Sequence, residues 1–196
     1  MLDHVFTDAI DALRGSLEQA LLERLAVEEH LNADVLLGDL TFETSYGLLG
    51  ETDPARVRAD ITLLWSTWSQ SAFRDWYVSE GFAEPPRIDI EVSLRIQRLV
   101  DPPDIERLSA TAPPEGPTLG RDPLVRSGLT VERVYDPELT SCANAFEVAY
   151  AGSYELDEET LEDSTRIDTE LAALGGWIAA ALVRLGDLDL AHLPDE

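Results

Sequence analysis

The stretch that decides the fold lies in the middle of the chain and reads Arg87-Ile88-Asp89-Ile90-Glu91-Val92-Ser93-Leu94-Arg95-Ile96-Gln97. Every second residue is a branched apolar side chain, and the residues between are charged or polar. This alternation predicts a strand over 87–99 with one buried face and one wet face. Such strands are typical of an antiparallel sheet covered on one side, whereas strands of a doubly wound parallel sheet are apolar throughout.

The same period of two recurs on both sides of this stretch. It predicts strands over Val35–Phe42 and over 56–68, with a turn at 50–54 between them, and strands over 127–135 and 145–156 further on. A short helix is expected over 70–80. The side chains expected to face inward are Val57, Ala59, Ile61, Leu63 and Trp65, then Leu129, Val131 and Val134, then Phe146, Val148, Tyr150 and Tyr154.

Apolar residues three and four positions apart predict an amphipathic helix over 2–28 and a second over 159–186, broken once. The stripe of the second helix consists of Leu171, Leu174, Ile178, Leu182 and Leu185. The proline-rich segment 101–124 is expected to be a loop. We therefore predict a single α+β domain over 1–196, in which an antiparallel sheet of four to five strands packs on one face against the long terminal helices.

The charge of the chain is strongly one-sided. Its 196 residues include 39 acidic and 14 basic side chains, all of the basic ones arginine, for a net charge of −25. Such a surface repels phosphate, which argues against nucleic-acid and anionic-membrane partners. A GC-rich genome or a high-salt cytoplasm would explain the acidity without any partner, and a basic partner is the alternative. We expect a soluble, cytoplasmic protein without a signal peptide.

The residues that usually carry chemistry are scattered. His4, His30 and His192 lie far apart, no metal-ligand spacing occurs, and Cys142 has no histidine near it in the sequence. Acidic pairs are frequent in a chain of this composition and are interpreted as solvated charge. Gly175-Gly176 lies within an apolar helix and is interpreted as a kink or a close helix contact. We therefore expect no catalytic residues, no metal and no cofactor.

Aromatic residues concentrate between positions 65 and 77. Trp65 belongs to the apolar face of a strand, whereas Trp68 falls on the opposite face of that strand. One side of a sheet does not bury all of these rings, and a surplus of exposed aromatics marks interfaces. The candidate binding or interface residues are Trp68, Phe73, Trp76 and Tyr77. Core packing together with a subunit interface is one interpretation, and a ligand surface is the other.

Two stretches resemble the SecB-like export chaperones. Gly38-Asp39-Leu40-Thr41-Phe42-Glu43-Thr44 is similar to the opening strand of that family, and Phe146 through Leu156 is similar to its last strand. An acidic segment, a helix and Leu188-Asp189-Leu190-Ala191-His192-Leu193-Pro194 then follow in the family's order. The resemblance implies a four-stranded antiparallel sheet backed by helices, dimers or tetramers, and apolar grooves that hold non-native polypeptide without catalysis.

A second class of protein fits the same pattern. Small α+β subunits with a leading helix and a strand-rich middle complete the tails of tailed viruses, where exposed strand edges and aromatic patches join them to their neighbours. The sequence thus predicts a homo-oligomeric, non-catalytic binding protein, with a SecB-like holdase first and a virion assembly subunit second. Both functions require self-association.

Overall fold

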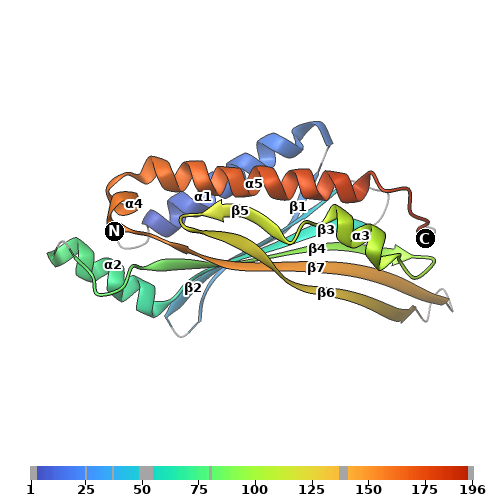
Figure 1. Cartoon of the computed structure of the whole chain (residues 1–196), viewed down its shortest axis with the longest axis horizontal. Helices are drawn as coiled ribbons and strands as arrows, with labels where there is room; N and C mark the ends of the chain where they lie inside the picture. Colours follow the sequence, from blue (N-terminus) through green and yellow to red (C-terminus); the bar gives the residue numbers. More distant parts are fainter. Residues whose placement is uncertain are drawn as a thin grey trace.

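The computed structural model describes residues 4–24, 26–36, 38–48, 55–79, 81–136 and 141–193. Helices lie at both ends of the chain, and strands fill most of the space between them (Figure 1). The helices are α1 His4–Leu21, η1 Leu22–Arg24 (a 3₁₀ turn), α2 Thr67–Ser79, α3 Ile105–Thr111, α4 Glu158–Glu162 and α5 Ser164–Gly186. The strands are β1 Val27–Leu36, β2 Asp39–Gly47, β3 Val57–Trp65, β4 Arg87–Leu99, β5 Glu115–Leu119, β6 Asp122–Asp136 and β7 Ser141–Glu155.

The strands form one sheet in the order β1-β2-β3-β4-β7-β6-β5, and each neighbouring pair is antiparallel. The α+β class and the antiparallel sheet are therefore confirmed. Seven strands join in the described part of the chain, so the sheet is wider than the four to five strands expected. The two additional strands arise where the sequence indicated a helix end and a loop.

Strands β3 and β4 form the centre of the core, as the alternation predicted. Their inward side chains pair across the strands, for example Ile61 opposite Val92 and Leu63 opposite Ile90. All four are buried, and burying a side chain of this size contributes about 1.5–3 kcal/mol. On β7 the predicted inward residues are also buried: Phe146, Val148, Tyr150 and Tyr154.

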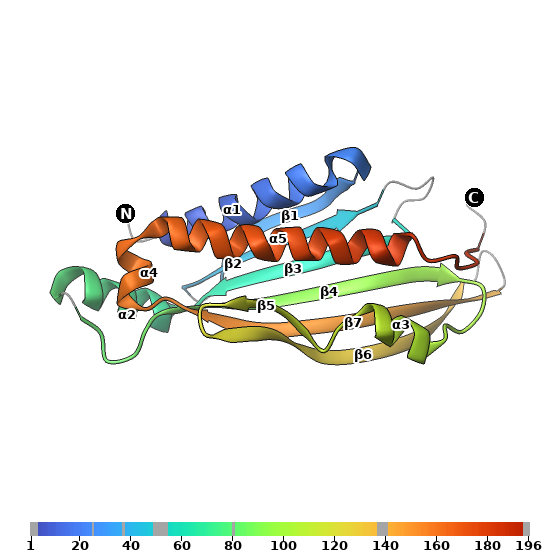
Figure 2. The same ribbon diagram turned by 45° about the horizontal axis from the view of Figure 1, so that its top comes forward.

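Helices α1 and α5 cover one face of the sheet, which confirms the predicted layering (Figure 2). Figure 2 shows α1 over the β1–β2 side and α5 along the middle of the sheet. The predicted stripe of α5, from Leu171 to Leu185, is buried. The single break in the C-terminal helix lies at Asp163, which ends α4 and whose carboxylate accepts a hydrogen bond from the Thr165 amide at the start of α5.

The two covering helices approach each other closely at Gly175. A Cβ atom there would lie 2.9 Å from the carbonyl oxygen of Leu13 and 2.9 Å from the Cβ of Ser16. The Ser16 hydroxyl also donates a 2.6 Å hydrogen bond to the carbonyl of Ala172. The sequence left a kink and a close helix contact open for this glycine pair, and Gly175 makes the close contact.

The N-terminal helix is shorter than predicted. The helix ends at Leu21 and is followed by the 3₁₀ turn, and the first strand begins at Val27. The sequence predicts a helix that continues to residue 28, so the predicted end is wrong. The strand expected over Val35–Phe42 is also wrong, because β1 ends at Leu36 and β2 begins at Asp39 after Gly38 with a φ of 94°. Glycine adopts this left-handed conformation without strain, and it allows the chain to reverse. The expected turn at 50–54 lies outside the described residues.

Segment 101–124 is not a loop. Asp104 caps α3 by accepting hydrogen bonds from the amides of Glu106 and Arg107, and β5 then pairs with the start of β6. Prolines 102 and 103 precede the helix, where a proline disrupts no helical hydrogen bond. The loop was predicted from the number of prolines, and this pattern does not reveal that Asp104 caps a helix.

Strand β6 also departs from its prediction. Leu129 packs against the core, and Val131 lies on the same inner face, opposite the buried Phe146, but is 37% exposed. Val134 lies on the opposite face of the strand and is exposed, so its inward prediction is wrong. This strand lies beyond the part of the sheet that α5 covers (Figure 2).

The chain after α5 is tied back to the end of β4. The amide of Val100 donates to the carbonyl of Ala191, and the amide of Leu193 donates to the carbonyl of Arg98. Arg24 forms an ion pair with Asp187, which connects the 3₁₀ turn to the end of α5. The terminal run that resembles the SecB-like family is therefore a strap across one end of the sheet, up to residue 193.

Helix α5 is long and apolar enough, over Thr165–Gly186, to cross a membrane by length and composition. A buried core helix passes the same test, and the inward stripe of α5 packs on the sheet. This packing accounts for the apolar composition of the helix.

Candidate functional site

The chemistry-bearing residues singled out in the sequence remain apart. The His4 ring lies against Phe73, and Nδ1 of His192 is 3.0 Å from the carbonyl oxygen of Gln97. The side chain of His30 lies outside the described residues, and Cys142 lies on β7 as a free thiol. Within the described ranges, no three His, Cys, Asp or Glu side chains are placed to hold a metal ion. The expectation that the protein uses no metal or catalytic residue stays a prediction.

The four predicted aromatic site residues do not form one surface. Phe73 is buried, with its ring 6.3 Å from Trp65 and 5.8 Å from Trp76. Trp76 is partly buried against the same core cluster. These two rings therefore help to attach α2 to the end of the sheet, and Phe73 is a core residue rather than an interface residue.

Trp68 and Tyr77 are the exposed members of the group, with 42% and 62% of their surface accessible. They are nine residues apart, which at about 100° per residue places them on opposite sides of α2. The ring of Trp68 lies under the guanidinium of Arg87, 5.5 Å from centroid to Cζ. A partner therefore meets one of these aromatic rings or the other, but not a continuous patch.

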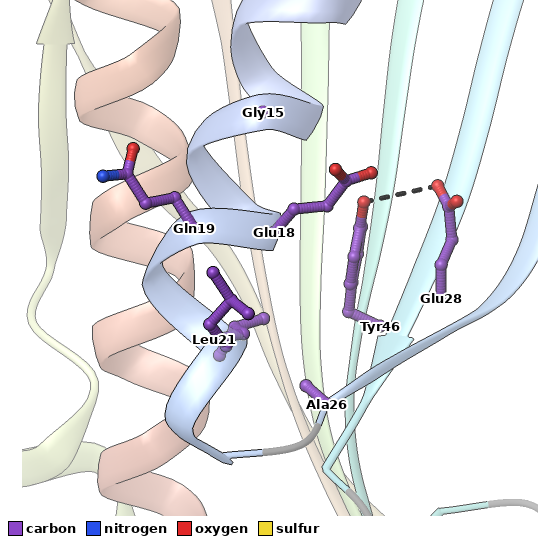
Figure 3. Close-up of a pocket in the computed structure, with 8 residues that line it drawn as sticks. Gly15, Glu18, Gln19, Leu21, Ala26, Glu28 and Tyr46 are labelled. Atoms are coloured by element: carbon purple, nitrogen blue, oxygen red, sulfur yellow. Dashed lines mark hydrogen bonds between the residues drawn. The ribbon is translucent and has the colours of Figure 1, made fainter.

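A groove lies between α1 and the β1–β2 side of the sheet (Figure 3). Its volume is about 790 Å³, and it is open to solvent. One wall is the outer stripe of α1 and the 3₁₀ turn, and the other wall belongs to β1 and β2. The lining residues are Gly15, Glu18, Gln19, Leu21, Leu22, Ala26, Glu28 and Tyr46.

Local sequence explains why this groove exists. Gly15 has no other atom within 4 Å of where its Cβ would lie, so the helix wall is thin there. A glycine inside a helix lowers its stability by about 1 kcal/mol relative to alanine. At Gly15 no close packing against another element requires a glycine. The 3₁₀ turn then carries Leu22 outward, where the side chain is largely exposed at the mouth of the groove. The groove is thus apolar at one end and open along the helix.

A carboxylate network forms the strand wall. Glu28 accepts two hydrogen bonds from Arg14, at 3.2 and 2.8 Å, and one from the Thr44 hydroxyl at 2.7 Å. The Tyr46 hydroxyl donates to the same carboxylate at 3.3 Å, the contact drawn in Figure 3. Burial opposes ionisation of Glu28, but the bonds from Arg14 and Thr44 and the arginine charge outweigh it, so its pKa lies below the ordinary value.

The same network keeps Tyr46 protonated. Burial, together with the negative charge of Glu28, raises the pKa of Tyr46 to about 12. A general acid or base works best with a pKa near the ambient pH, and neither group meets this condition. The network therefore serves to hold α1 against β1 and β2, which keeps the two walls of the groove at a fixed separation.

We expect Glu28→Gln to lower the free energy of unfolding at pH 7 by about 1–2 kcal/mol, because it removes a charge-assisted hydrogen-bonding partner of Arg14. Because the folded-state pKa of Glu28 is depressed, its contribution is complete above the ordinary carboxyl pKa and is lost as the pH falls through the folded value. Denaturant unfolding of both proteins from pH 7 to pH 3 measures this.

The matched control is Glu18→Gln, which removes a carboxylate that is mostly exposed and 3.8 Å from the same arginine. Its effect should stay within about 0.5 kcal/mol. An unfolding difference for Glu28→Gln that is constant over the whole pH range would contradict the prediction.

Sequence reasoning missed this groove because residues 22–28 were assigned to the first helix. On a helix, Glu28 would lie among other solvated acids, whereas on β1 it lies directly opposite Tyr46. One signal was present: Leu40, Phe42, Thr44 and Tyr46 alternate along one face of β2. A strand with that pattern needs a partner strand on its free side, and the segment just before it is near enough in sequence to supply one.

Comparisons with family models, with curated proteins and with solved structures found no match to this chain. The resemblance to SecB-like chaperones is neither supported nor opposed by them. The function must therefore be argued from the groove, the strand edges and the charge.

Proposed function

We propose that the protein is a non-catalytic polypeptide-binding protein that self-associates and holds non-native chains in the groove between α1 and the β1–β2 side of the sheet. The observation that carries this proposal is the groove itself, with the exposed Leu22 and the partly buried Ala26 at its apolar end and Glu18 on its rim. Its volume also suits a small molecule, but it is an open channel rather than an enclosed cavity.

The position of β1 favours an extended chain as the ligand. β1 is the first strand in the sheet order, so within the described structure only the edge facing β2 is paired. An extended segment that adds to a free strand edge gains main-chain hydrogen bonds and presents every second side chain to the same face. Here that face includes the groove.

The net charge of the protein favours client segments of opposite charge. With a net charge of −25, the protein attracts cationic chains and repels acidic ones. The groove adds an apolar contact at Leu22 and Ala26. The preferred clients are therefore segments in which aliphatic and basic residues alternate.

A virion assembly subunit is the second candidate, and one observation favours it. Most of β6 has no neighbouring strand on its outer side in the described structure, and an exposed strand edge is a means of joining subunits. The two candidates differ in their response to unfolded protein. A holdase suppresses aggregation near a stoichiometric ratio, whereas an assembly subunit ignores the client.

We expect Gly15→Leu to impair client binding by at least about fivefold while leaving the fold intact, because the new side chain occupies the groove. No atom lies within 4 Å of the position of its Cβ, and leucine is a better helix former than glycine, so thermal stability should be equal or higher. The measurement is light scattering of reduced lysozyme, a basic client, against the ratio of protein to client. Reduced α-lactalbumin, an acidic client, should be suppressed more weakly.

The matched control is Ala20→Leu, which adds leucine to an exposed position of the same helix that is not among the described groove residues. It should suppress aggregation as the unmodified protein does. If Gly15→Leu and Ala20→Leu behave alike, the groove is not the binding site. If neither the variants nor the unmodified protein suppress aggregation, the holdase function is wrong.

A further inference from the structure

One strand edge of this sheet is long, exposed and chemically mixed. β6 spans Asp122–Asp136 and pairs with β7 from Val125 to Asp136. On its other side it pairs with β5 only through Asp122, Pro123 and Val125. From residue 127 to residue 136 no described strand lies outside it, and Figure 2 shows β6 as the outermost strand over this part.

The side chains along this edge are unusually apolar for solvent. Val131, Val134 and Tyr135 are 37%, 52% and 61% exposed. Natural proteins generally protect such edges with proline, lysine, a bulge or a covering element. β6 has a register shift between Arg126 and Gly128, but beyond it the strand continues regularly to Asp136. An uncovered edge of this length recruits another strand.

We propose that this edge pairs with the β6 edge of a second copy of the chain, antiparallel and about a two-fold axis centred on Val131. The self-association is part of the proposed function, and this inference assigns it to one surface and one partner. Two seven-stranded sheets would then join into a single continuous sheet, with the helices of both copies on the same side.

Charge identifies the second copy as the occupant. Two molecules of charge −25 repel each other over most of their surfaces. The stretch 126–136 is locally neutral, with Arg126 and Arg133 balancing Glu132 and Asp136. The Glu132 carboxylate already accepts a 2.7 Å hydrogen bond from Arg95. A cationic client has little to gain at a neutral edge, whereas a second copy meets the least repulsion there.

The register follows from symmetry and charge. A two-fold axis perpendicular to the sheet keeps the faces matched, so a residue at the centre lies opposite itself. Centring on Glu132 or Arg133 would put like charges opposite each other, and centring on Val134 would put Glu132 opposite Asp136. Each of these arrangements is destabilising. Centring on Val131 places Thr130 opposite Glu132 and Leu129 opposite Arg133, and it uses more of the edge than centring on Thr130.

The test is the mass in solution of the protein and of two charge variants, measured by size-exclusion chromatography with light scattering. The unmodified protein should have a mass close to twice the 21.6 kDa of one chain. Val131→Glu and Val131→Lys should each raise the dimer dissociation constant at least about tenfold, because each places two like charges opposite one another at the axis. An equimolar mixture of the two variants should recover the dimer, since the opposite charges then face each other.

The same pair of substitutions at Val78, which is equally apolar and largely exposed on α2, should leave the mass unchanged. Thermal unfolding of all four variants shows that they fold. The proposal is overturned if the unmodified protein is monomeric at every concentration, if Val131→Glu remains dimeric, or if the mixture of Val131 variants stays monomeric. The measurement involves no client, so its failure is distinguishable from failure of the groove.

Discussion

Phe73→Ala is expected to lower the free energy of unfolding by about 3–5 kcal/mol, the largest effect of any single substitution considered for α2. The ring of Phe73 is buried among Trp65, Trp76 and His4, and its removal leaves a cavity where α2 meets the sheet. Urea unfolding followed by tryptophan fluorescence measures this directly, because two of the neighbouring rings are tryptophan.

Tyr77→Ala provides the comparison on the same helix. Tyr77 is exposed, so its replacement should change the free energy of unfolding by no more than about 0.5 kcal/mol. Any loss of self-association or client binding in Tyr77→Ala would then report a surface contact. Equal destabilisation by both substitutions would mean that the assignment of Phe73 to the core and Tyr77 to the surface is wrong.

Gly175→Ala and Gly176→Ala should have opposite effects, although the two positions are adjacent on α5. A methyl group at Gly175 meets the backbone of α1 at 2.9 Å, which separates the two helices and costs about 1–3 kcal/mol. A methyl group at Gly176 has no other atom within 4 Å, so the gain in helix propensity of about 1 kcal/mol remains. Because both positions lie inside α5 and gain the same helix propensity, the difference between the variants equals the overpacking cost of about 1–3 kcal/mol.

Thermal unfolding monitored by circular dichroism compares the two variants under one set of conditions. The Gly175 variant should also change client binding in the groove, because displacing α1 from α5 changes the position of the helix wall relative to β1 and β2. If both alanines raise the unfolding temperature, the helices do not meet at Gly175.

The predictable parts of the fold are the segments in which buried and exposed residues repeat at a regular spacing. β3 alternates from Val57 to Trp65 and β4 from Arg87 to Gln97, because each packs one face under the helices. The pattern indicated the orientation of both strands and the bounds of β4. The predicted end of β3 at residue 68 is wrong, because the strand ends at Trp65 and Trp68 lies on α2. The stripe from Leu171 to Leu185 placed α5 in the same way. In these segments local sequence and tertiary packing require the same residues.

Prediction failed where a segment lies at an edge or a junction. The second half of β6 carries exposed valines, so the alternation of its residues does not indicate burial there. Val131 lies on the predicted inner face but is exposed, and Val134 was wrongly placed on that face. The helix of α1 continues its apolar spacing through Leu21 and Leu25 in the sequence, although the chain turns at residues 22–24. Where the helix stops depends on β2, which needs a neighbour on its outer side.

The place of the candidate site was not predictable from the sequence. Composition and motifs favoured a binding surface without catalytic residues, which stays a prediction, and the aromatic cluster drew attention to α2. That cluster is divided by helix geometry, because Trp68 and Tyr77 project from opposite sides. The groove depends instead on Gly15, on the 3₁₀ turn and on Glu28 opposite Tyr46, and these lie in separate segments that only the folded chain brings together.

The position of α5 in the chain has a consequence for synthesis. The strands that α5 covers are synthesised before the helix. About a hundred residues separate the end of β3 from the start of α5, and translating them takes roughly 5–20 s. During that interval α1 is already synthesised, but the part of the apolar face of β3 and β4 that packs against α5 lacks its cover. Nascent chains therefore pass through an aggregation-prone stage that ends when α5 emerges and docks.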